Sequence, residues 1–137
     1  MIAIGGTLIS LLLIKIFALP MPTMLTQSIT QYPLWFSVWV VVTSSIGEEV
    51  LYRGYTLERL GQLTGSIWVG GLITLVWFCA MHLSLGVVYV LTIALPTTAL
   101  ITALYCWRRD LVATSIVHFV FNAPIIAASI LFAIAAN

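Results

Sequence analysis

Long apolar runs with almost no charge between them limit what this chain can fold into. Among 137 residues there are five basic and four acidic side chains, and 62% of the residues are hydrophobic. Soluble domains carry about 25% charged residues. A water-soluble fold of this size has too little interior to hide so much apolar surface. The composition therefore indicates an integral membrane protein. We expect an all-α fold, a polytopic membrane helix bundle, because helices satisfy their backbone hydrogen bonds within lipid.

Five apolar segments approach the length of about 20 residues that crosses a bilayer. We expect transmembrane helices at 2–19, 34–60, 67–83, 87–107 and 111–136. Pro20 and Pro22 end the first of them, and an uncharged loop follows. We accordingly divide the chain into an N-terminal transmembrane helix and loop, 1–33, and a helical core, 34–137.

The few basic residues predict the orientation of the chain in the membrane. Arg59 follows the second expected helix, and Arg108 and Arg109 follow the fourth, so these loops should lie on one side. Basic loops face the cytoplasm, which predicts a cytoplasmic N-terminus. The formal net charge of +1 gives no reason to expect a nucleic-acid partner.

Several ionisable side chains fall inside the expected helices, where each costs about 2.5 to 3.5 kcal/mol to insert. They are Glu48, Glu49, Arg53, His82 and His118. Such residues usually face a partner or a water-filled cavity. A structural ion pair with two hydrogen-bonded core histidines is one explanation, and a functional site is the other. The presence of all of them in so short a chain favours the functional site.

Helix geometry separates the two glutamates. Glu49 and Arg53 are spaced i,i+4 on one helix face and can form an ion pair, whereas Glu48 shares the neighbouring face with Tyr52. Glu49 can then be neutralised while Glu48 faces a cavity, in the environment of a general base. Two carboxylates that share one proton would need both side chains on one face, and this spacing argues against that arrangement.

Two further pairs have the same i,i+4 spacing. Phe78 precedes His82 by one turn, so an aromatic ring is expected beside the imidazole. His118 precedes Asn122 in the same way, so both side chains can donate hydrogen bonds toward one point. Pro124 lacks a backbone N–H and is expected to disrupt the helix there. Membrane helices tolerate such a disruption where they line a cavity.

These motifs, in this order, resemble those of a known family. The segments "EEVLYR", "FCAMH" and "HFVFN" match the patterns E-E-x-x-x-R, F-x-x-x-H and H-x-x-x-N. The patterns are those of the CPBP intramembrane proteases, also called the Abi or type II CAAX prenyl protease family. The resemblance covers residues 34–124. It implies an all-helical membrane fold and an intramembrane endopeptidase, with 34–137 as the catalytic core.

The resemblance also implies a role for each candidate residue. One glutamate would activate the hydrolytic water, one histidine would hold or polarise that water, and a His/Asn pair would stabilise the oxyanion. In that order these catalytic residues are Glu48, His82, His118 and Asn122. The residues expected to brace or support the site are Glu49, Arg53, Tyr52 and Phe78. The implied substrate is a membrane-associated peptide or protein, and the implied location is a bacterial cytoplasmic membrane.

The resemblance leaves open whether the site holds a metal. Family members are often labelled metalloproteases, and one glutamate with two histidines makes a three-ligand zinc site with an open position. The zinc ligands would be Glu48 or Glu49, His82 and His118. The chain has no H-E-x-x-H motif, and Asn122 suits an oxyanion better than zinc. We therefore expect no cofactor and a water activated by glutamate alone, with zinc as the alternative.

Other functions remain open at this stage. A non-catalytic immunity protein, or one that binds a peptide or lipid, could keep the same fold and residues. A small transporter would need a repeated half, and we find no repeat. Only one expected helix precedes the glutamate motif, where family members usually have more. The chain is then a minimal member, a fragment, or part of an assembly with a second copy or another membrane subunit.

Overall fold

The structure, a computed structural model, describes residues 15–16 and 32–135. Within these ranges every regular element is a helix and there is no strand. The predicted all-α fold is confirmed. Most of the first expected helix, 2–19, and most of the loop after it lie outside the described residues.

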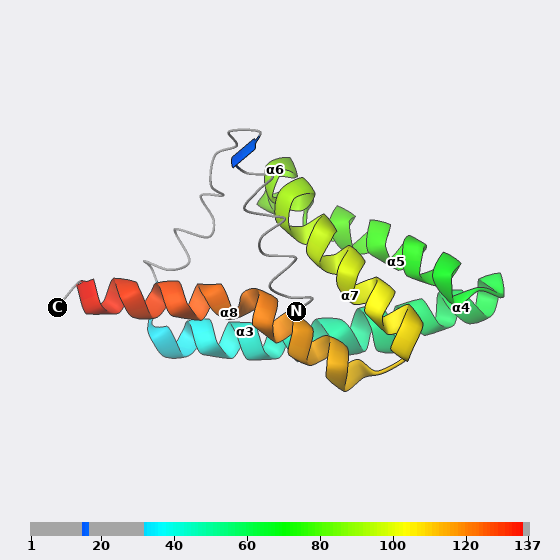
Figure 1. Cartoon of the computed structure of the whole chain (residues 1–137), viewed down its shortest axis with the longest axis horizontal. Helices are drawn as coiled ribbons and strands as arrows, with labels where there is room; N and C mark the ends of the chain where they lie inside the picture. The colour runs from blue at the N-terminus through cyan, green and yellow to red at the C-terminus, as the bar shows by residue number, and fades with distance from the viewer. Residues whose placement is uncertain (1–14, 17–31, 136–137) are drawn as a thin grey trace.

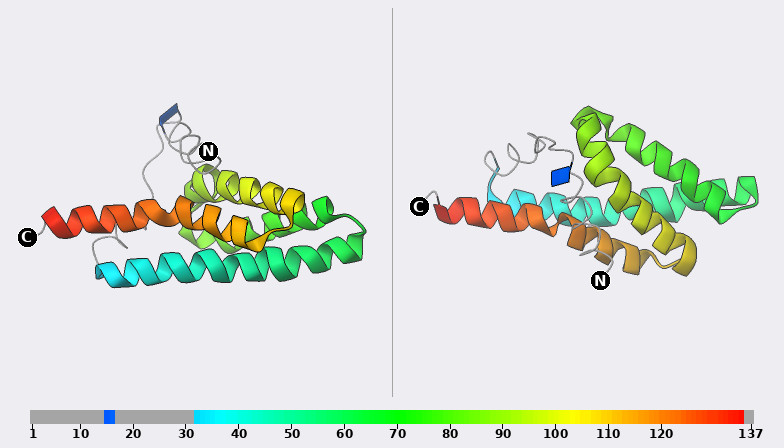
Figure 2. Two further views of the ribbon diagram at one scale, coloured as in Figure 1. Left: turned by 60° about the horizontal axis from the view of Figure 1, so that its bottom comes forward. Right: turned by 45° about the horizontal axis from the view of Figure 1, so that its top comes forward.

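The longest element is a continuous helix of 31 residues from Leu34 to Thr64. Its parts are α3 (Leu34–Glu48), the π-helix η1 (Glu49–Leu57) and α4 (Glu58–Thr64). The helix ends where Gly65 takes the left-handed conformation at φ 72°, which glycine adopts without steric cost. A second long helix, α8 (Leu111–Ala135), lies along α3 in the opposite direction (Figures 1 and 2).

The middle of the long helix was not predicted to be a π-helix. In a π-helix the backbone hydrogen bonds join residues five apart, and such segments are rare and frequently mark functional sites. The side chain of Thr56 follows the same spacing, because its Oγ1 donates to the Leu51 carbonyl oxygen at 2.9 Å. The sequence analysis assumed α-helical geometry here. The residue pattern gives no signal that separates the two helix types.

A second pair of helices packs against η1 and α4. The first is α5 (Ile67–Met81), and α7 (Leu95–Arg108) runs back beside it (Figure 1). The elements between them are η2 (Leu83–Leu85), α6 (Val87–Tyr89) and η3 (Val90–Ala94). Gly86 lies at φ 104° and ψ 144°, a conformation nearly restricted to glycine, and it lets the chain turn into α6.

Three helices of the described chain are long and apolar enough to cross a membrane. They are Leu34–Thr64, Val87–Arg108 and Leu111–Ala135, and they correspond to the second, fourth and fifth expected helices. The predicted polytopic membrane bundle is confirmed, with five as an approximate count. The third expected helix, 67–83, is shorter than predicted, because α5 has 15 residues and the chain leaves helical geometry at His82, where φ is −94° and ψ is 1°.

The described part of the molecule buries many polar side chains and exposes many large apolar ones. Large apolar side chains such as Trp35, Trp39 and Trp77 are exposed. The buried polar residues are Ser37, Ser45, Glu49, Arg53, Thr74, Thr92, Thr98, Thr102, Thr114, His118 and Ser129. This distribution is the reverse of that in a soluble protein. It is what a helix bundle surrounded by lipid requires.

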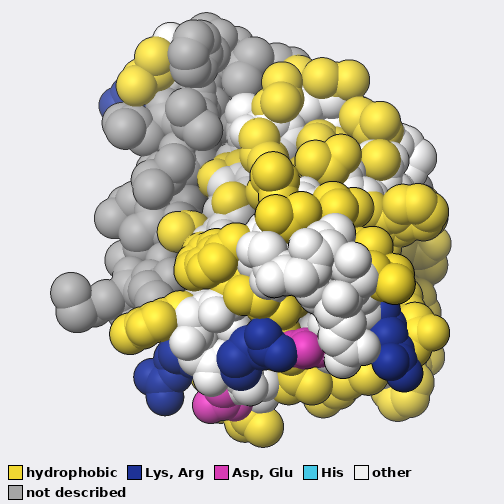
Figure 3. Space-filling model, turned by 90° about the vertical axis from the view of Figure 1, so that its right-hand side faces the viewer, with side chains coloured by type: hydrophobic (Ala, Val, Ile, Leu, Met, Phe, Trp, Pro, Cys, Tyr) yellow, Lys and Arg dark blue, Asp and Glu magenta, His cyan; other side chains and the backbone are white. Residues whose placement is uncertain are grey.

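Charged side chains gather at the end of the molecule where α4 turns into α5 and α7 into α8 (Figure 3). Tyr105 Oη donates to Glu58 Oε1 at 2.8 Å, and Arg109 Nη2 donates to Glu58 Oε2 at 2.5 Å. These bonds tie α4 to the end of α7. They place the segments with Arg59, Arg108 and Arg109 at one end, as the sequence predicts. That this end faces the cytoplasm stays a prediction.

The backbones of α4 and α5 touch through two glycines. A Cβ atom on Gly70 would lie 2.5 Å from the Gly61 nitrogen and 2.8 Å from the Leu57 carbonyl oxygen. Glycines at a helix interface allow this approach, and in lipid such close packing is a main source of helix association. The contact fixes α5 against the end of the helix that carries η1.

We expect Gly70→Ala to destabilise the protein, because the added methyl group meets backbone atoms that only a shift of α4 or α5 can relieve. Overpacking of this kind typically costs about 1–3 kcal/mol. The measurement is the thermal unfolding of the variant and the wild type in detergent micelles. Gly47→Ala is the matched control, since a Cβ there meets nothing within 4 Å. That variant should keep its stability or gain up to about 1 kcal/mol. Wild-type stability of Gly70→Ala would contradict the backbone contact.

Candidate active site

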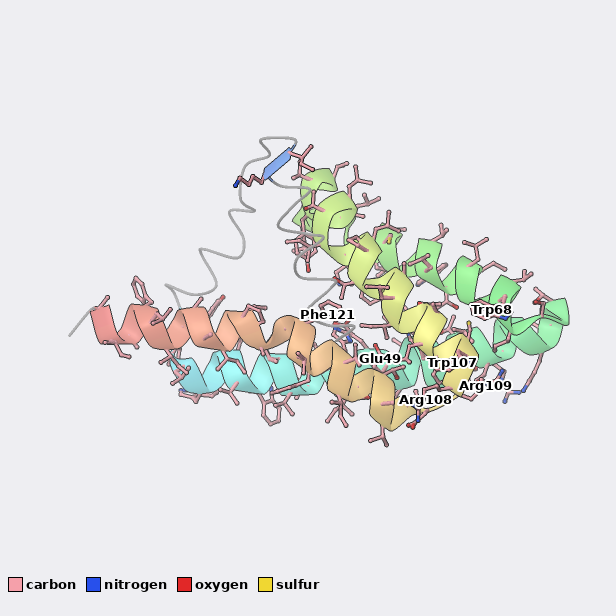
Figure 4. All side chains as sticks on the ribbon, in the orientation of Figure 1. Glu49, Trp68, Trp107, Arg108, Arg109 and Phe121 are labelled. Atoms are coloured by element: carbon pink, nitrogen blue, oxygen red, sulfur yellow. The ribbon has the colours of Figure 1, made fainter. Side chains whose placement is uncertain are left out.

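A buried ion pair lies at the centre of the molecule. Glu49 and Arg53, both in η1, have no exposed surface, and Arg53 Nη1 donates to Glu49 Oε1 at 2.9 Å. The i,i+4 pair predicted from the sequence is therefore confirmed. Glu49 lies where α8 crosses the long helix (Figure 4).

Arg53 connects η1 to two other helices. Its Nη2 donates to the Thr98 carbonyl oxygen at 3.3 Å and to Thr102 Oγ1 at 3.2 Å, both on α7. Its Cζ lies 5.4 Å from the centroid of the Phe78 ring on α5, within the range of cation–π attraction. Neither threonine was predicted from the sequence. Thr98 accepts through its backbone, so its side chain gives no signal, whereas the hydroxyl of Thr102 inside an apolar helix was one.

His118 on α8 contacts the same glutamate. Its Nδ1 lies 2.9 Å from Glu49 Oε1, and the residue is buried. An ionised carboxylate only accepts hydrogen bonds, so this contact assigns a proton to Nδ1. The other ring nitrogen, Nε2, then lies 3.9 Å from Glu48 Oε2. One imidazole therefore stands between two carboxylates.

The two glutamates differ in burial and in partners. The Glu49 side chain is fully buried between Arg53 and His118. The Glu48 side chain keeps 29% of its surface exposed, and its contact with His118 is longer than a hydrogen bond. This division agrees with the helix-face argument, although the turn from Glu49 onward is π-helical. The catalytic role of Glu48 remains a prediction.

His82 lies one residue past the end of α5 and against an aromatic pair. Its ring stacks on Phe78 at 4.2 Å between centroids with an interplanar angle of 19°, so the predicted neighbour is present. Its Nδ1 lies 2.8 Å from the Phe78 carbonyl oxygen, which assigns a proton to Nδ1 and leaves Nε2 for another partner. Tyr52 packs edge-on against Phe78 at 4.9 Å. Phe78 thus contacts the rings of His82 and Tyr52 and lies within cation–π range of Arg53.

Asn122 lies one turn beyond His118 on α8 and is half-buried. The two residues share a face of one helix, as the spacing predicts. The helix continues through Pro124 to Ala135, so the expected disruption at the proline does not end it. The lost backbone hydrogen bond is local, and neighbouring helices in a membrane protein can compensate for it.

The buried cluster is not fully satisfied by the described residues. Glu49 Oε2, Arg53 Nε and Ser45 Oγ are buried and have no hydrogen-bond partner among them. Unpaired buried polar atoms cost free energy, and native proteins retain few of them. A site that breaks this rule is more often functional than structural.

The absence of a metal stays a prediction, with zinc as the alternative. Nowhere in 15–16 and 32–135 do three His, Cys, Asp or Glu side chains lie close enough together to hold a metal ion. His118 Nδ1 is occupied by Glu49 and His82 Nδ1 by a backbone carbonyl. These contacts leave Nε2 of each imidazole as the nitrogen that a metal would take, so they do not decide between the two alternatives.

The comparisons with known proteins identify a family. Residues 30–124 match the family model described as type II CAAX prenyl endopeptidase Rce1-like, a stretch that exceeds half of the chain. It contains every candidate residue named above and agrees with the family indicated by the three motifs. No curated protein and no solved structure matches the chain. The chain therefore belongs to the Rce1-like family of type II CAAX prenyl endopeptidases.

Proposed function

We propose that the protein is an intramembrane endopeptidase that hydrolyses a peptide bond in a membrane-associated peptide or protein. The observation that carries the proposal is the approach of Glu48 Oε2 to His118 Nε2 at 3.9 Å, across two helices far apart in sequence. That distance is too long for a direct hydrogen bond. It lets the water oxygen at Glu48 and the substrate carbonyl oxygen at His118 lie next to each other, as they must in order to bond to one carbon atom in the intermediate.

In the proposed reaction Glu48 is the general base. Its carboxylate takes a proton from a water molecule while the water oxygen bonds to the carbonyl carbon of the substrate, and an electron pair moves onto the carbonyl oxygen. When this intermediate collapses, the C–N bond breaks and Glu48 gives its proton to the leaving amine. The products are a carboxylic acid and an amine, and the enzyme is unchanged.

His118 and Asn122 stabilise the oxyanion in this proposal. The Nδ1 proton of His118 is directed at Glu49, so Nε2 can donate only when the ring is an imidazolium. With Arg53 and the two glutamates, that cation makes a group of no net charge, which suits a buried site. A single oxyanion donor is worth about 2.7 to 4 kcal/mol of barrier.

The other candidates position these groups. Glu49 holds the His118 ring through Nδ1, and Arg53 neutralises Glu49 and anchors it to α7. His82 holds or polarises the water, and Phe78 fixes the orientation of its ring by stacking. Tyr52 supports Phe78 from the other side.

The proposal extends to setting and cofactor. The protein acts without a metal in a bacterial cytoplasmic membrane, with its N-terminus in the cytoplasm. Its partners are the lipid bilayer and a membrane-associated substrate. A second copy of the chain or another membrane subunit is a further proposed partner.

We expect Glu48→Gln to lower peptide cleavage about 10²- to 10⁴-fold, because the amide cannot accept the proton from water. The assay compares cleavage of a peptide library by wild type and variant in liposomes. Glu58→Gln is the matched control, since Glu58 bonds to Tyr105 and Arg109 at the charged end, and it should cleave like wild type. Equal cleavage by Glu48→Gln and wild type would refute the base. Peptide binding with no cleavage by either would favour a non-catalytic immunity or binding protein.

Metal chelation provides a separate test. Cleavage by the wild-type protein should be unchanged after incubation with a chelator and dialysis, because the candidate ligands do not form a three-ligand group. The measurement is the initial rate before and after treatment, with zinc added back in a third sample. Loss of the rate on chelation and its return with zinc would establish a metal enzyme.

The ion pair between Glu49 and Arg53 can be tested through the free energy of unfolding. Arg53→Met should lower the free energy of unfolding by about 3–5 kcal/mol, because it leaves Glu49 buried without its main countercharge. Adding Glu49→Gln to that variant should recover part of the loss, as a double-mutant cycle measures. Arg108→Gln, at an exposed arginine, should change stability by less than about 0.5 kcal/mol. Additive losses from the two site changes would mean that the pair does not interact.

A further inference from the structure

A groove runs between the long helix and α5 on the outer face of the bundle. Its volume is about 600 Å³, within the range of sites that take small molecules. The residues that line it are Leu51, Tyr52, Tyr55, Thr56, Arg59, Leu60, Ile73, Trp77 and Met81. Most of the apolar ones are exposed, so the groove faces the lipid phase.

The groove has a narrow, charged end and a wide, apolar end. The two helices touch at Gly61 and Gly70, and Gly61 is two residues from Arg59. Away from this contact the helices diverge (Figures 1 and 2). Arg59 follows Tyr52 by seven positions in the helix, a length of about 10 Å at 1.5 Å per residue. An elongated apolar chain fits this shape with a polar group at one end.

The charge at the narrow end is not neutralised by a carboxylate. Arg59 is the one charged residue among the described residues that line the groove. Its Nη1 donates to Gln62 Oε1 at 3.1 Å, and its Cζ lies 5.9 Å from the Tyr55 ring. The neighbouring Glu58 bonds instead to Tyr105 and Arg109. The guanidinium therefore keeps its positive charge and spare donors for an anion.

We propose that this groove binds an anionic phospholipid. The lipid phosphate pairs with Arg59 at the charged end of the molecule (Figure 3), and one acyl chain lies along Leu51, Ile73 and Trp77 toward Tyr52. A guanidinium binds phosphate through two parallel hydrogen bonds, and basic sites between membrane helices bind anionic headgroups. A second outer groove, between the long helix and α8, has no charged lining residue, so it offers no such selectivity.

The proposed lipid would contact the wall of the candidate site. Tyr52 lines the wide end of the groove and packs against Phe78, on which His82 stacks. In this proposal the rings of Tyr52 and Phe78 separate the acyl chain from the imidazole. This site is separate from the proposed peptidase chemistry, and its binding does not depend on catalysis.

The test measures lipid binding to the full chain in detergent by native mass spectrometry and by thermal unfolding. Phosphatidylglycerol should bind and raise the unfolding midpoint more than phosphatidylcholine with the same acyl chains. Glycerol phosphate alone should not compete, because it lacks the chain. Arg59→Gln should weaken phosphatidylglycerol binding about tenfold or more, the loss of a charge-assisted contact. Arg108→Gln, a matched change at the same end outside the groove, should bind like wild type.

Several outcomes would overturn the site. Equal affinity for the two lipids, or an Arg59→Gln variant that retains phosphatidylglycerol affinity, would show that Arg59 selects no anion. An equal loss in Arg108→Gln would mean a diffuse attraction to the basic end. A dimer that persists with phosphatidylglycerol and is broken by Ile73→Arg would show that a second copy fills the groove. A protein that cleaves no peptide but still binds phosphatidylglycerol selectively would support the lipid site. That result would contradict only the proposed peptidase function.

Discussion

A single carboxylate oxygen, Glu49 Oε1, is the centre of the hydrogen bonds that connect the helices in the interior of this protein. It accepts a hydrogen bond from Arg53 and lies 2.9 Å from the Nδ1 of His118. Arg53 in turn reaches α7 and α5, so four segments of the bundle meet around one atom. In lipid an unpaired charge is not solvated by water and is therefore costly. The helices must therefore pack in the one arrangement that keeps these partners in contact.

The sequence predicted the local part of this arrangement. Pairs such as Glu49 with Arg53, and Phe78 with His82, lie one turn apart on a single helix, and their contact follows from helix geometry alone. Three of the expected membrane helices also follow from apolar length. Both predictions depend only on residues close together in the chain. Four residues are close to one turn in a π-helix as in an α-helix. The predicted contact of Glu49 with Arg53 therefore forms even though η1 is a π-helix.

The contacts between helices could not be predicted in the same way. Nothing in the sequence says that His118 Nδ1 meets Glu49 while its Nε2 faces Glu48, because that depends on how α8 crosses the long helix. The hydrogen bond from Arg53 to Thr102 and the glycine contact between α4 and α5 have the same origin. Each requires a close approach of helices that only the packed bundle defines. The motifs identify the residues of the candidate site, and the packing of the helices determines which of these residues contact one another.

Adjacent residues on a helix must face different surroundings, and this protein uses that constraint twice. Glu49 is enclosed by its partners, whereas the Glu48 side chain keeps 29% of its surface exposed. In the proposed mechanism the brace, Glu49, needs burial and the base, Glu48, must reach water, so one residue could not serve both roles. On α8 the buried His118 is followed by Phe119, which is 38% exposed and lines the outer groove against α3. The same turn of helix thus presents an imidazole to the polar interior and an aromatic ring to lipid. A hydrolytic site inside a membrane needs this boundary, because water must reach the carboxylate while acyl chains are kept out.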